Sequence, residues 1–246
     1  MKLSVCIICK NEKDKIERCL ESVKWADEII VLDSGSTDET RAIANKYTDK
    51  VFVRDDWQGF GEQRRRAEAL ATNDWIFAID CDEVVSERLK EEIITTLAKC
   101  NEKNILKLNR LTHFCGQFIR HSGWYPDRIA RIYNKKITGY NQNLVHESIV
   151  MLDCKPIELK ENILHFQYED IFGYMNKRNH YAHIGAEQIV KKGKKSSLLK
   201  ASSSAFFAFI RHYFLRRGFL DGKAGFVIAV IQSQYSFNKY LFAYYK

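Results

Sequence analysis

The chain has 246 residues, of which 46% are hydrophobic and 28% charged, a composition typical of a folded globular protein and not of a disordered one. The formal net charge of +8 is uneven, because residues 171–246 hold 13 Lys and Arg against two acidic residues while residues 1–170 carry a balance of −3. We expect neither a signal peptide nor a membrane-spanning helix, since the N-terminal apolar run is short and no run reaches about eighteen apolar residues.

The first hundred residues alternate between apolar runs and helical periodicity. The run "LSVCIIC" at 3–9 predicts a buried strand, and Ile16, Cys19, Leu20 and Val23 then recur at helical spacing. A strand followed by an amphipathic helix is the first predicted pair.

Seven cysteines are scattered along the chain. Cys6 and Cys9 have the spacing of some metal and redox motifs, but residues three apart in a strand face opposite sides. We therefore expect no zinc or redox site there and interpret the cysteines as reduced thiols of a cytosolic protein.

Two more strand-and-helix pairs follow. The run "EIIVLD" at 28–33 predicts a second strand, and the capping-box spacing of Ser36 and Glu39 places a helix start at Ser36. "KVFVRD" at 50–55 predicts a third strand, and "GEQRRRAEALA" at 61–71 predicts a third helix.

A fourth pair completes this region. "DWIFAID" at 74–80 predicts a strand, and Ser86 is a good cap for a helix that runs to about Lys99. Repeated pairs of this kind with wholly apolar strands predict a parallel sheet that helices cover on both faces.

Polar residues come at the ends of three of these strands. Asn11 follows the first strand, Asp33 ends the second and Asp80 ends the fourth. Ligands of parallel sheets bind at the carboxyl ends of the strands, so the sequence predicts a ligand site at this edge.

Residues 105–166 change in character. "ILKLNR", "RIARIYN", "LVHESIV" and "ILHFQ" look like strands with irregular connections, and we expect a mixed extension of the sheet that covers the site. From Asp170 the pattern is helical to residue 246, with a lysine-rich break at "KKGKKSS" and a tight turn at "GFLDG".

Three acidic residues cluster directly after the fourth strand, in "IFAIDCDEVVS". Asp80, Asp82 and Glu83 repel one another, so a positive partner is expected. A divalent cation such as Mg²⁺ or Mn²⁺, bridging a carboxylate and a diphosphate, would account for the cluster. The alternative is that Asp82 and Glu83 begin a helix, where acidic residues suit the helix dipole.

Three segments carry a family resemblance. "SVCIICKNE", "EIIVLDSGSTDET" and "DWIFAIDCDE" together resemble the inverting nucleotide-sugar glycosyltransferases of family 2, and Asp80-Cys81-Asp82 matches the D-x-D motif of that family. "GFGEQRR", "GWYPDRIARIYN", "VHE" and "RRGFLDGKAG" resemble a subgroup that adds sugars, often glucose, to the inner core of bacterial lipopolysaccharide. The resemblance covers nearly the whole chain.

The resemblance implies an α/β fold of the GT-A type, with a mostly parallel Rossmann-like sheet, a mixed sheet extension and C-terminal helices. We expect a catalytic domain at 1–170, in which 1–100 bind the nucleotide-sugar and 101–170 form the acceptor and base segment. Residues 171–246 would form a basic, amphipathic helical region that packs on this domain and faces a membrane.

The resemblance also implies roles in donor binding. Asp33 would accept a hydrogen bond from the uracil of a UDP-sugar, and Asn11 and Glu12 would lie along the same pocket. A carboxylate suits this contact, because its bond to the imide N–H is charge-assisted. Alternatively, Asp33 forms the turn before Ser34 and Gly35.

The D-x-D motif and the third helix supply the other expected donor residues. By resemblance, Asp80 lies beside the ribose and Asp82 binds a divalent metal, Mn²⁺ or Mg²⁺. Gln63 and Arg64 fall where relatives begin a donor-binding helix. The arginines of "QRRR" at 63–66 would bind the diphosphate or, alternatively, form a solvated helix face.

An inverting transferase needs a general base that takes the proton of the attacking hydroxyl. Asp127 matches the usual position of the base, and Glu147 is the alternative. His146 could bind the metal or position the acceptor, and Trp124 and Tyr125 could stack on an acceptor sugar. The competing interpretations are a surface ion pair of Asp127 with Arg128 or Arg131, a polar strand residue for His146, and core packing for the aromatic pair.

The C-terminal region mixes Phe with Lys and Arg. Such helices can lie in the headgroup plane of an anionic bilayer, although their apolar faces could also simply pack on the catalytic domain. No nucleic-acid-binding motif is present, so nucleic acid is not expected as a partner.

Together these features predict a metal-dependent inverting glycosyltransferase. It would move a hexose, glucose in our interpretation, from a UDP-sugar to a heptose or related sugar of a lipid-anchored oligosaccharide, the lipopolysaccharide inner core. The enzyme would be cytoplasmic and peripheral to the inner membrane of a Gram-negative bacterium. The alternatives are another cell-envelope glycan as acceptor, a haloacid-dehalogenase-type phosphatase, and a non-catalytic module that binds the membrane surface.

Overall fold

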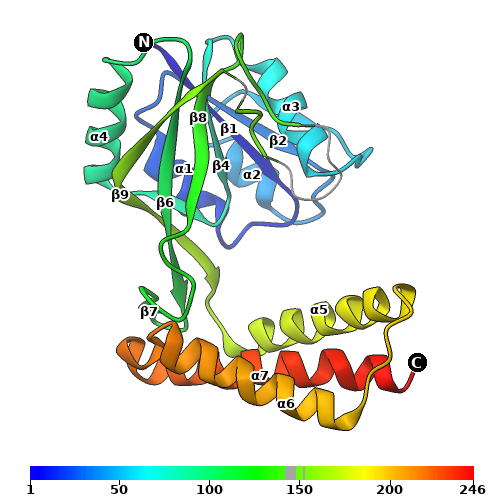
Figure 1. The fold of residues 1–246 in the computed structure, drawn as a ribbon. Coiled ribbons are helices and arrows are strands. Elements are labelled where there is room, and N and C mark those ends of the chain that lie inside the picture. The colour runs from blue at the N-terminus through cyan, green and yellow to red at the C-terminus, as the bar shows by residue number, and fades with distance from the viewer. Residues whose placement is uncertain (142–147, 152) are drawn as a thin grey trace. The chain divides into compact units, whose positions relative to one another are not determined.

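The computed structural model describes residues 1–141, 148–151 and 153–246 (Figure 1). The chain forms two compact units, each with its own apolar core. The first unit holds Met1–Arg110 and Asp127–His165, and the second holds Leu111–Pro126 and Phe166–Lys246. Residues 111–126, which we expected in the acceptor and base segment, thus belong to the second unit.

A mixed sheet with the strand order β3-β2-β1-β4-β8-β6-β9-β5 forms the centre of the first unit. Its strands are β1 (Leu3–Cys9), β2 (Glu28–Asp33), β3 (Val51–Val53), β4 (Trp75–Asp80), β5 (Glu83–Val85), β6 (Asn104–Phe114), β8 (Arg128–Asn134) and β9 (Lys155–Tyr168). β1 pairs in parallel with β2 and β4, while β8 pairs antiparallel with β4 and β6. In this register Cys9 lies opposite Asp33, and Ile8 lies opposite Asp80. The predicted parallel sheet and its mixed extension are both confirmed.

Helices cover both faces of this sheet. α1 (Ile16–Val23), α2 (Thr40–Ala44) and α4 (Glu87–Leu97) contribute to one core cluster, and α3 (Phe60–Leu70) contributes to the other. The four apolar residues expected on one face of α1 are all fully buried. Each such side chain stabilises the fold by roughly 1.5–3 kcal/mol.

Two helix starts were predicted from capping residues, and only one is right. Ser86 accepts a hydrogen bond from the backbone N of Leu89 at 3.2 Å and begins α4. The expected start at Ser36 is wrong, because α2 begins at Thr40. The Ser36 hydroxyl donates to Asp33 and accepts from the backbone N of Asn11, so it joins two loops instead of capping a helix.

The acidic cluster lies on a turn. β4 ends at Asp80, a turn follows at Cys81 and Asp82, and β5 begins at Glu83. The helix-start alternative for Asp82 and Glu83 is therefore wrong. The two aspartates also do not share one continuous strand, and they have different partners.

The cysteines are free thiols. Cys6 packs in the cluster that includes α3, and Cys9 packs in the cluster that includes α1, so the two residues face opposite sides of the sheet as expected. Burial raises the pKa of the Cys6 thiol well above its usual value, which makes it a poor nucleophile.

Helices dominate the second unit. They are α5 (Ile171–Lys191), α6 (Leu198–Ile210), a π-helical turn (Arg211–Leu215), a 3₁₀ turn (Gly218–Asp221) and α7 (Gly222–Tyr244). The short strand β7 (Gln117–Phe118) also belongs to this unit. The predicted break at "KKGKKSS" and the tight turn at "GFLDG" are confirmed, and Gly222 takes a left-handed φ of 60° in that turn. Among the described residues, no helix combines the length and the apolar character needed to cross a bilayer.

Candidate active site

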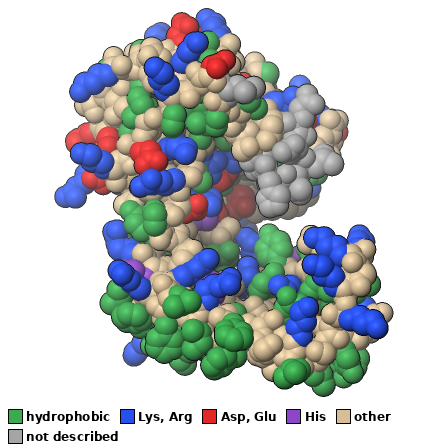
Figure 2. All heavy atoms as spheres, in the orientation of Figure 1, with side chains coloured by type: hydrophobic (Ala, Val, Ile, Leu, Met, Phe, Trp, Pro, Cys, Tyr) green, Lys and Arg blue, Asp and Glu red, His purple; other side chains and the backbone are tan. Residues whose placement is uncertain are grey.

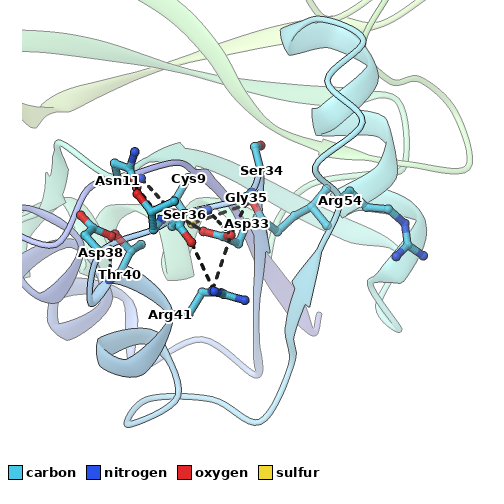
Figure 3. Close-up of polar contacts among 12 residues, drawn as sticks. Cys9, Asn11, Asp33, Ser34, Gly35, Ser36, Asp38, Thr40, Arg41 and Arg54 are labelled. Atoms are coloured by element: carbon cyan, nitrogen blue, oxygen red, sulfur yellow. Dashed lines mark hydrogen bonds and ion pairs between the residues drawn. The ribbon is translucent and has the colours of Figure 1, made fainter.

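The loops that follow β1 and β2 are joined by hydrogen bonds (Figure 3). The backbone N of Asn11 donates to the Ser36 hydroxyl at 2.8 Å, and the Asn11 side-chain oxygen accepts from the backbone N of Thr37 at 2.8 Å. The backbone N of Glu12 donates to the Thr40 hydroxyl, also at 2.8 Å. Asn11 takes a left-handed φ of 55°, which asparagine tolerates better than most residues. The two loops therefore form one ordered edge, with the Asn11 side chain exposed on it.

Asp33 is fully buried beneath this edge. One carboxylate oxygen accepts from the backbone N of Gly35 at 3.0 Å and of Ser36 at 2.8 Å, and the other accepts from the Ser36 hydroxyl. Nε of Arg41 lies 3.9 Å from a carboxylate oxygen of Asp33, and Figure 3 marks this ion pair with a dashed line. These contacts are those expected if Asp33 forms the turn before Ser34 and Gly35. A hydrogen bond from Asp33 to uracil stays a prediction.

Gln63 is also buried and supports the same edge. Its side-chain nitrogen donates to the Ser34 hydroxyl and to the backbone oxygen of Arg54, both at 2.9 Å. Through Gln63, helix α3 holds the loop after β2 and the end of β3 in place. The direct donor contact expected of Gln63 stays a prediction.

Two buried arginines supply the positive charge that the acidic cluster requires. Arg64 of α3 pairs with one oxygen of Asp80, and Arg131 of β8 pairs with the other. Arg131 also donates to Glu83 at 2.7 Å. Burial would raise the pKa of Asp80, but Arg131 and Arg64 outweigh burial and hold that pKa well below its usual range. Asp80 is therefore ionised at neutral pH and held rigidly.

Asp82 has a different partner. Its carboxylate lies 3.4 Å from Nε2 of His165, a residue of β9 that pairs with Glu83 across the sheet. Burial would raise the pKa of Asp82, but the hydrogen bond and charge of His165 outweigh burial and lower it. Neither Arg131 nor His165 was predicted as a site residue. Each lies in a segment predicted as a strand, and only the folded structure brings it to the acidic cluster.

The same residues can be tested for a fit to a divalent cation. Both oxygens of Asp80 are taken by guanidinium groups, so Asp80 is a poor metal ligand. Two ligands about 2.1 Å from one octahedral ion lie roughly 3 Å apart, which is close to the separation of Asp82 and His165. Across residues 1–141, 148–151 and 153–246 no three His, Cys, Asp or Glu side chains gather as a complete metal site. Asp82 and His165 thus fit two positions of an ion whose other ligands are phosphate and water.

Asp127 is held by an arginine of the neighbouring strand. Its carboxylate accepts from Nε and Nη2 of Arg110, both at 2.8 Å, and the backbone N of Arg110 donates to the backbone O of Asp127 at 2.8 Å. The partner is thus not the adjacent Arg128, which pairs with Glu158 at 2.7 Å. The Asp127 side chain remains 37% exposed, so a hydroxyl group can reach it.

The remaining predicted residues are elsewhere. Glu147 and His146 lie outside the described residues. Trp124 packs edge-on against Phe114 at 5.7 Å between ring centroids in the core of the second unit, which is the core-packing alternative. The Tyr125 ring lies 5.9 Å from the guanidinium of Arg120. Acceptor contacts by Trp124 and Tyr125 stay predictions.

Comparisons with known proteins show which proteins this chain is similar to. The model of glycosyl transferase family 2 matches residues 4–159. An uncharacterized glycosyltransferase of Rickettsia conorii is 33% identical over 98% of this chain and 88% of its own length. The lipopolysaccharide core biosynthesis glycosyltransferase LpsC of Rhizobium meliloti is 29% identical over 96% of this chain and 89% of its own length.

A solved structure is also similar. S. aureus TarS 1–349, determined in complex with UDP, is 18% identical and has a TM-score of 0.51. The match covers 74% of this chain and 64% of that one, and it shows a shared fold.

Proposed function

Because the chain belongs to glycosyl transferase family 2, we propose that it moves a hexose, in our view glucose, from a UDP-sugar to a sugar of the lipopolysaccharide inner core. The similarity to LpsC along almost the whole chain supports this acceptor class. Family membership leaves the phosphatase and the non-catalytic module without support. Another cell-envelope glycan remains the alternative acceptor.

One observation carries the proposal. The loops after β1 and β2 and the end of β4 meet at one edge of the sheet, and Asp80 and Asp82 are held there in ionised form. Ordered backbone and fixed carboxylates at such an edge suit a nucleotide-sugar that extends from the β1 and β2 loops toward β4. In this arrangement Asn11 and Glu12 line the nucleotide pocket, and Asp33 shapes the loop beneath it.

Asp82 and His165 would hold the divalent cation, Mn²⁺ or Mg²⁺. When bound, the cation stabilises the negative charge of the departing diphosphate. Asp80 would lie beside the ribose, and its two arginines prevent it from turning away. Because both oxygens of Asp80 pair with arginines, Asp82 is the aspartate of the D-x-D motif that remains available for a metal.

Asp127 would be the general base. The acceptor oxygen forms a bond to the anomeric carbon while the bond from that carbon to the UDP oxygen breaks, and UDP leaves with the electron pair. The proton of the acceptor hydroxyl passes to the Asp127 carboxylate. Attack from the face opposite UDP inverts the anomeric centre, and Arg110 orients the carboxylate for this transfer.

The experiment compares three full-length variants in UDP binding and in transfer from UDP-glucose to isolated inner-core oligosaccharide. We expect Asp82→Asn to lose metal-dependent turnover by 100-fold or more, and Asp127→Asn to bind UDP like the wild type yet lose transfer to a similar extent (about two to four orders of magnitude for a positioned base). The control is Asp74→Asn. Asp74 immediately precedes the first residue of β4, at the end of the strand away from Asp80, and forms a surface ion pair with Lys136. A wild-type protein that binds no UDP would refute the proposal, and activity retained by Asp127→Asn would move the base to Glu147.

We also propose that the second unit binds an anionic membrane surface, at the cytoplasmic face of the inner membrane of a Gram-negative bacterium. Large apolar side chains are exposed on α6 and the turn after it, among them Leu199 at 80%, Phe207 at 66% and Leu215 at 75%. In Figure 2 green apolar side chains gather along the C-terminal helices, with blue Lys and Arg among them. A lipid-anchored acceptor would be presented at such a surface.

A further inference from the structure

A basic cavity of about 390 Å³ opens beside Asp80 in the first unit. Its volume lies within the range of small-ligand sites, roughly 300–1,000 Å³. Six charged side chains line it, and five of them are basic: Arg64, Lys107, Arg110, Arg128 and Arg131 surround the single acid Asp80. The aromatic ring of Tyr140 forms part of the wall, with the guanidinium of Arg64 5.2 Å from its centroid.

The positive charge of this lining is only partly compensated. Lys107 has no ion pair within the part of the chain that the structure describes. Nε and Nη1 of Arg64 and Nε of Arg131 are buried and have no hydrogen-bond partner among those same residues. Both guanidinium groups pair with Asp80, but buried N–H groups that lack a hydrogen bond are costly, so an anion that reached these nitrogens would be stabilised.

The cavity extends from Asp80, which we propose lies beside the ribose, toward β8 and β6. Along the sheet β2, β1, β4, β8 and β6 follow one another, so β8 and β6 lie on the other side of β4 from the loops proposed to bind the nucleotide. Lys107 belongs to β6, and Arg128 belongs to β8. Arg110 both lines the cavity and holds Asp127, so a group bound in the cavity lies next to the proposed base.

We propose that this cavity binds an anionic substituent, a phosphate or a carboxylate, carried by the acceptor sugar. The inference rests on the proposed transferase function and narrows its substrate class to acidic saccharides. Lys107, which has no ion pair among the described residues, supplies a positive charge for the anion, and Arg128, which also pairs with Glu158, adds a second cationic side chain to the lining. The attacking hydroxyl of the same sugar is thereby positioned at Asp127.

The test uses the full chain and simple sugars as probes, measured by calorimetry with UDP at saturating concentration so that the donor pocket is filled. Glucose 6-phosphate tests the phosphate source and galacturonate tests the carboxylate source, each against its neutral parent, glucose or galactose. We expect at least one acidic sugar to bind about tenfold more tightly than its parent, and Lys107→Gln to remove most of that difference, because hydrogen bonds to charged groups are the strong ones. Lys103→Gln is the matched control, since this exposed lysine immediately precedes β6 and does not line the cavity.

Each outcome decides the inference. No preference for either acidic sugar, or a preference that Lys107→Gln and Arg128→Gln leave unchanged, would overturn it. Weaker binding of UDP itself in Lys107→Gln would show that the cavity holds the donor diphosphate, which would also overturn it. If the wild type binds no UDP, the proposed donor is wrong, while the preference for acidic sugars measured without UDP still tests the cavity.

Discussion

At the scale of single residues, Asp80 shows how a buried acidic cluster is compensated. The sequence places three carboxylates within four positions, which require a positive partner, and we expected a metal ion. The structure provides Arg64 and Arg131 for Asp80 and leaves Asp82 to His165. The identity of these partners was not predictable from the sequence. Arg131 lies 51 positions after Asp80, and His165 lies 83 positions after Asp82. Each comes close to its partner only through strand pairing.

The pairing of Asp80 predicts a large loss of stability on its removal. Asp80→Ala leaves two buried guanidinium groups with less compensation, and we expect the free energy of unfolding to fall by about 3–5 kcal/mol. Asp74→Ala removes a surface carboxylate next to the same strand and should cost about 1 kcal/mol or less. Urea unfolding at pH 7 measures both, and equal losses in the two variants would contradict the ion-pair account of Asp80.

At the scale of secondary-structure elements, local patterns were sufficient for most strands and helices. The buried face of α1 and the cap of α4 are properties of short segments, and both were predictable. The start of α2 was not, because Ser36 is used by Asp33 and Asn11, and nothing local favours that use over a capping box. For the same reason the sequence indicated Asn11, Asp33 and Asp80 as edge residues but not the hydrogen bonds that hold them.

Glu28 joins several elements at the opposite end of the sheet. It begins β2 and accepts hydrogen bonds from Ser4 of β1, from Lys50 before β3 and from Thr72 after α3. Burial would raise its pKa, but these bonds outweigh burial and lower the pKa from 4.5 to about 2. A depressed folded pKa means that Glu28 stabilises the fold above pH 4.5 and loses this contribution as the pH falls toward 2.

We therefore expect Glu28→Gln to lower the free energy of unfolding by about 2–3 kcal/mol at pH 7. The difference from wild type should shrink steadily between pH 4.5 and about 2. Glu17→Gln, at an exposed position of α1, is the control and should change stability by about 0.5 kcal/mol or less. A difference that stays constant with pH would contradict this assignment of stability to the ionised carboxylate.

At the scale of the whole molecule, the two units divide the tasks that we propose. The first unit holds Asp80, Asp82, their arginine and histidine partners and the basic cavity, while the second carries most of the exposed aromatic side chains. The basic, aromatic character of the C-terminal region was visible in the sequence. The sequence did not indicate that residues 111–126 belong to the second unit. That depends on β6 and β9, each of which begins in the first unit and ends in the second.

The membrane proposal makes a prediction for this second unit. Phe206 and Phe207 of α6 are 62% and 66% exposed, and replacing both with Ser should weaken binding to vesicles containing about 30% anionic lipid at least tenfold, since burying one such ring is worth roughly 1.5–3 kcal/mol. Phe172→Ser is the control, because this 73% exposed residue lies in the first turn of α5 instead. Vesicle co-sedimentation measures the binding, and unchanged sedimentation of the double variant would refute the role of α6.

The double ion pair of Asp80 has a consequence for how such a protein can diverge. Arg64 belongs to α3 and Arg131 to β8, so one carboxylate depends on two residues that are 67 positions apart in the sequence. A chimera that joined residues 1–100 of one relative to the remainder of another would have to inherit a compatible set of all three side chains. If residues 1–100 bind the donor as we propose, exchanging them to obtain a new donor is constrained by Arg131, which lies outside that segment.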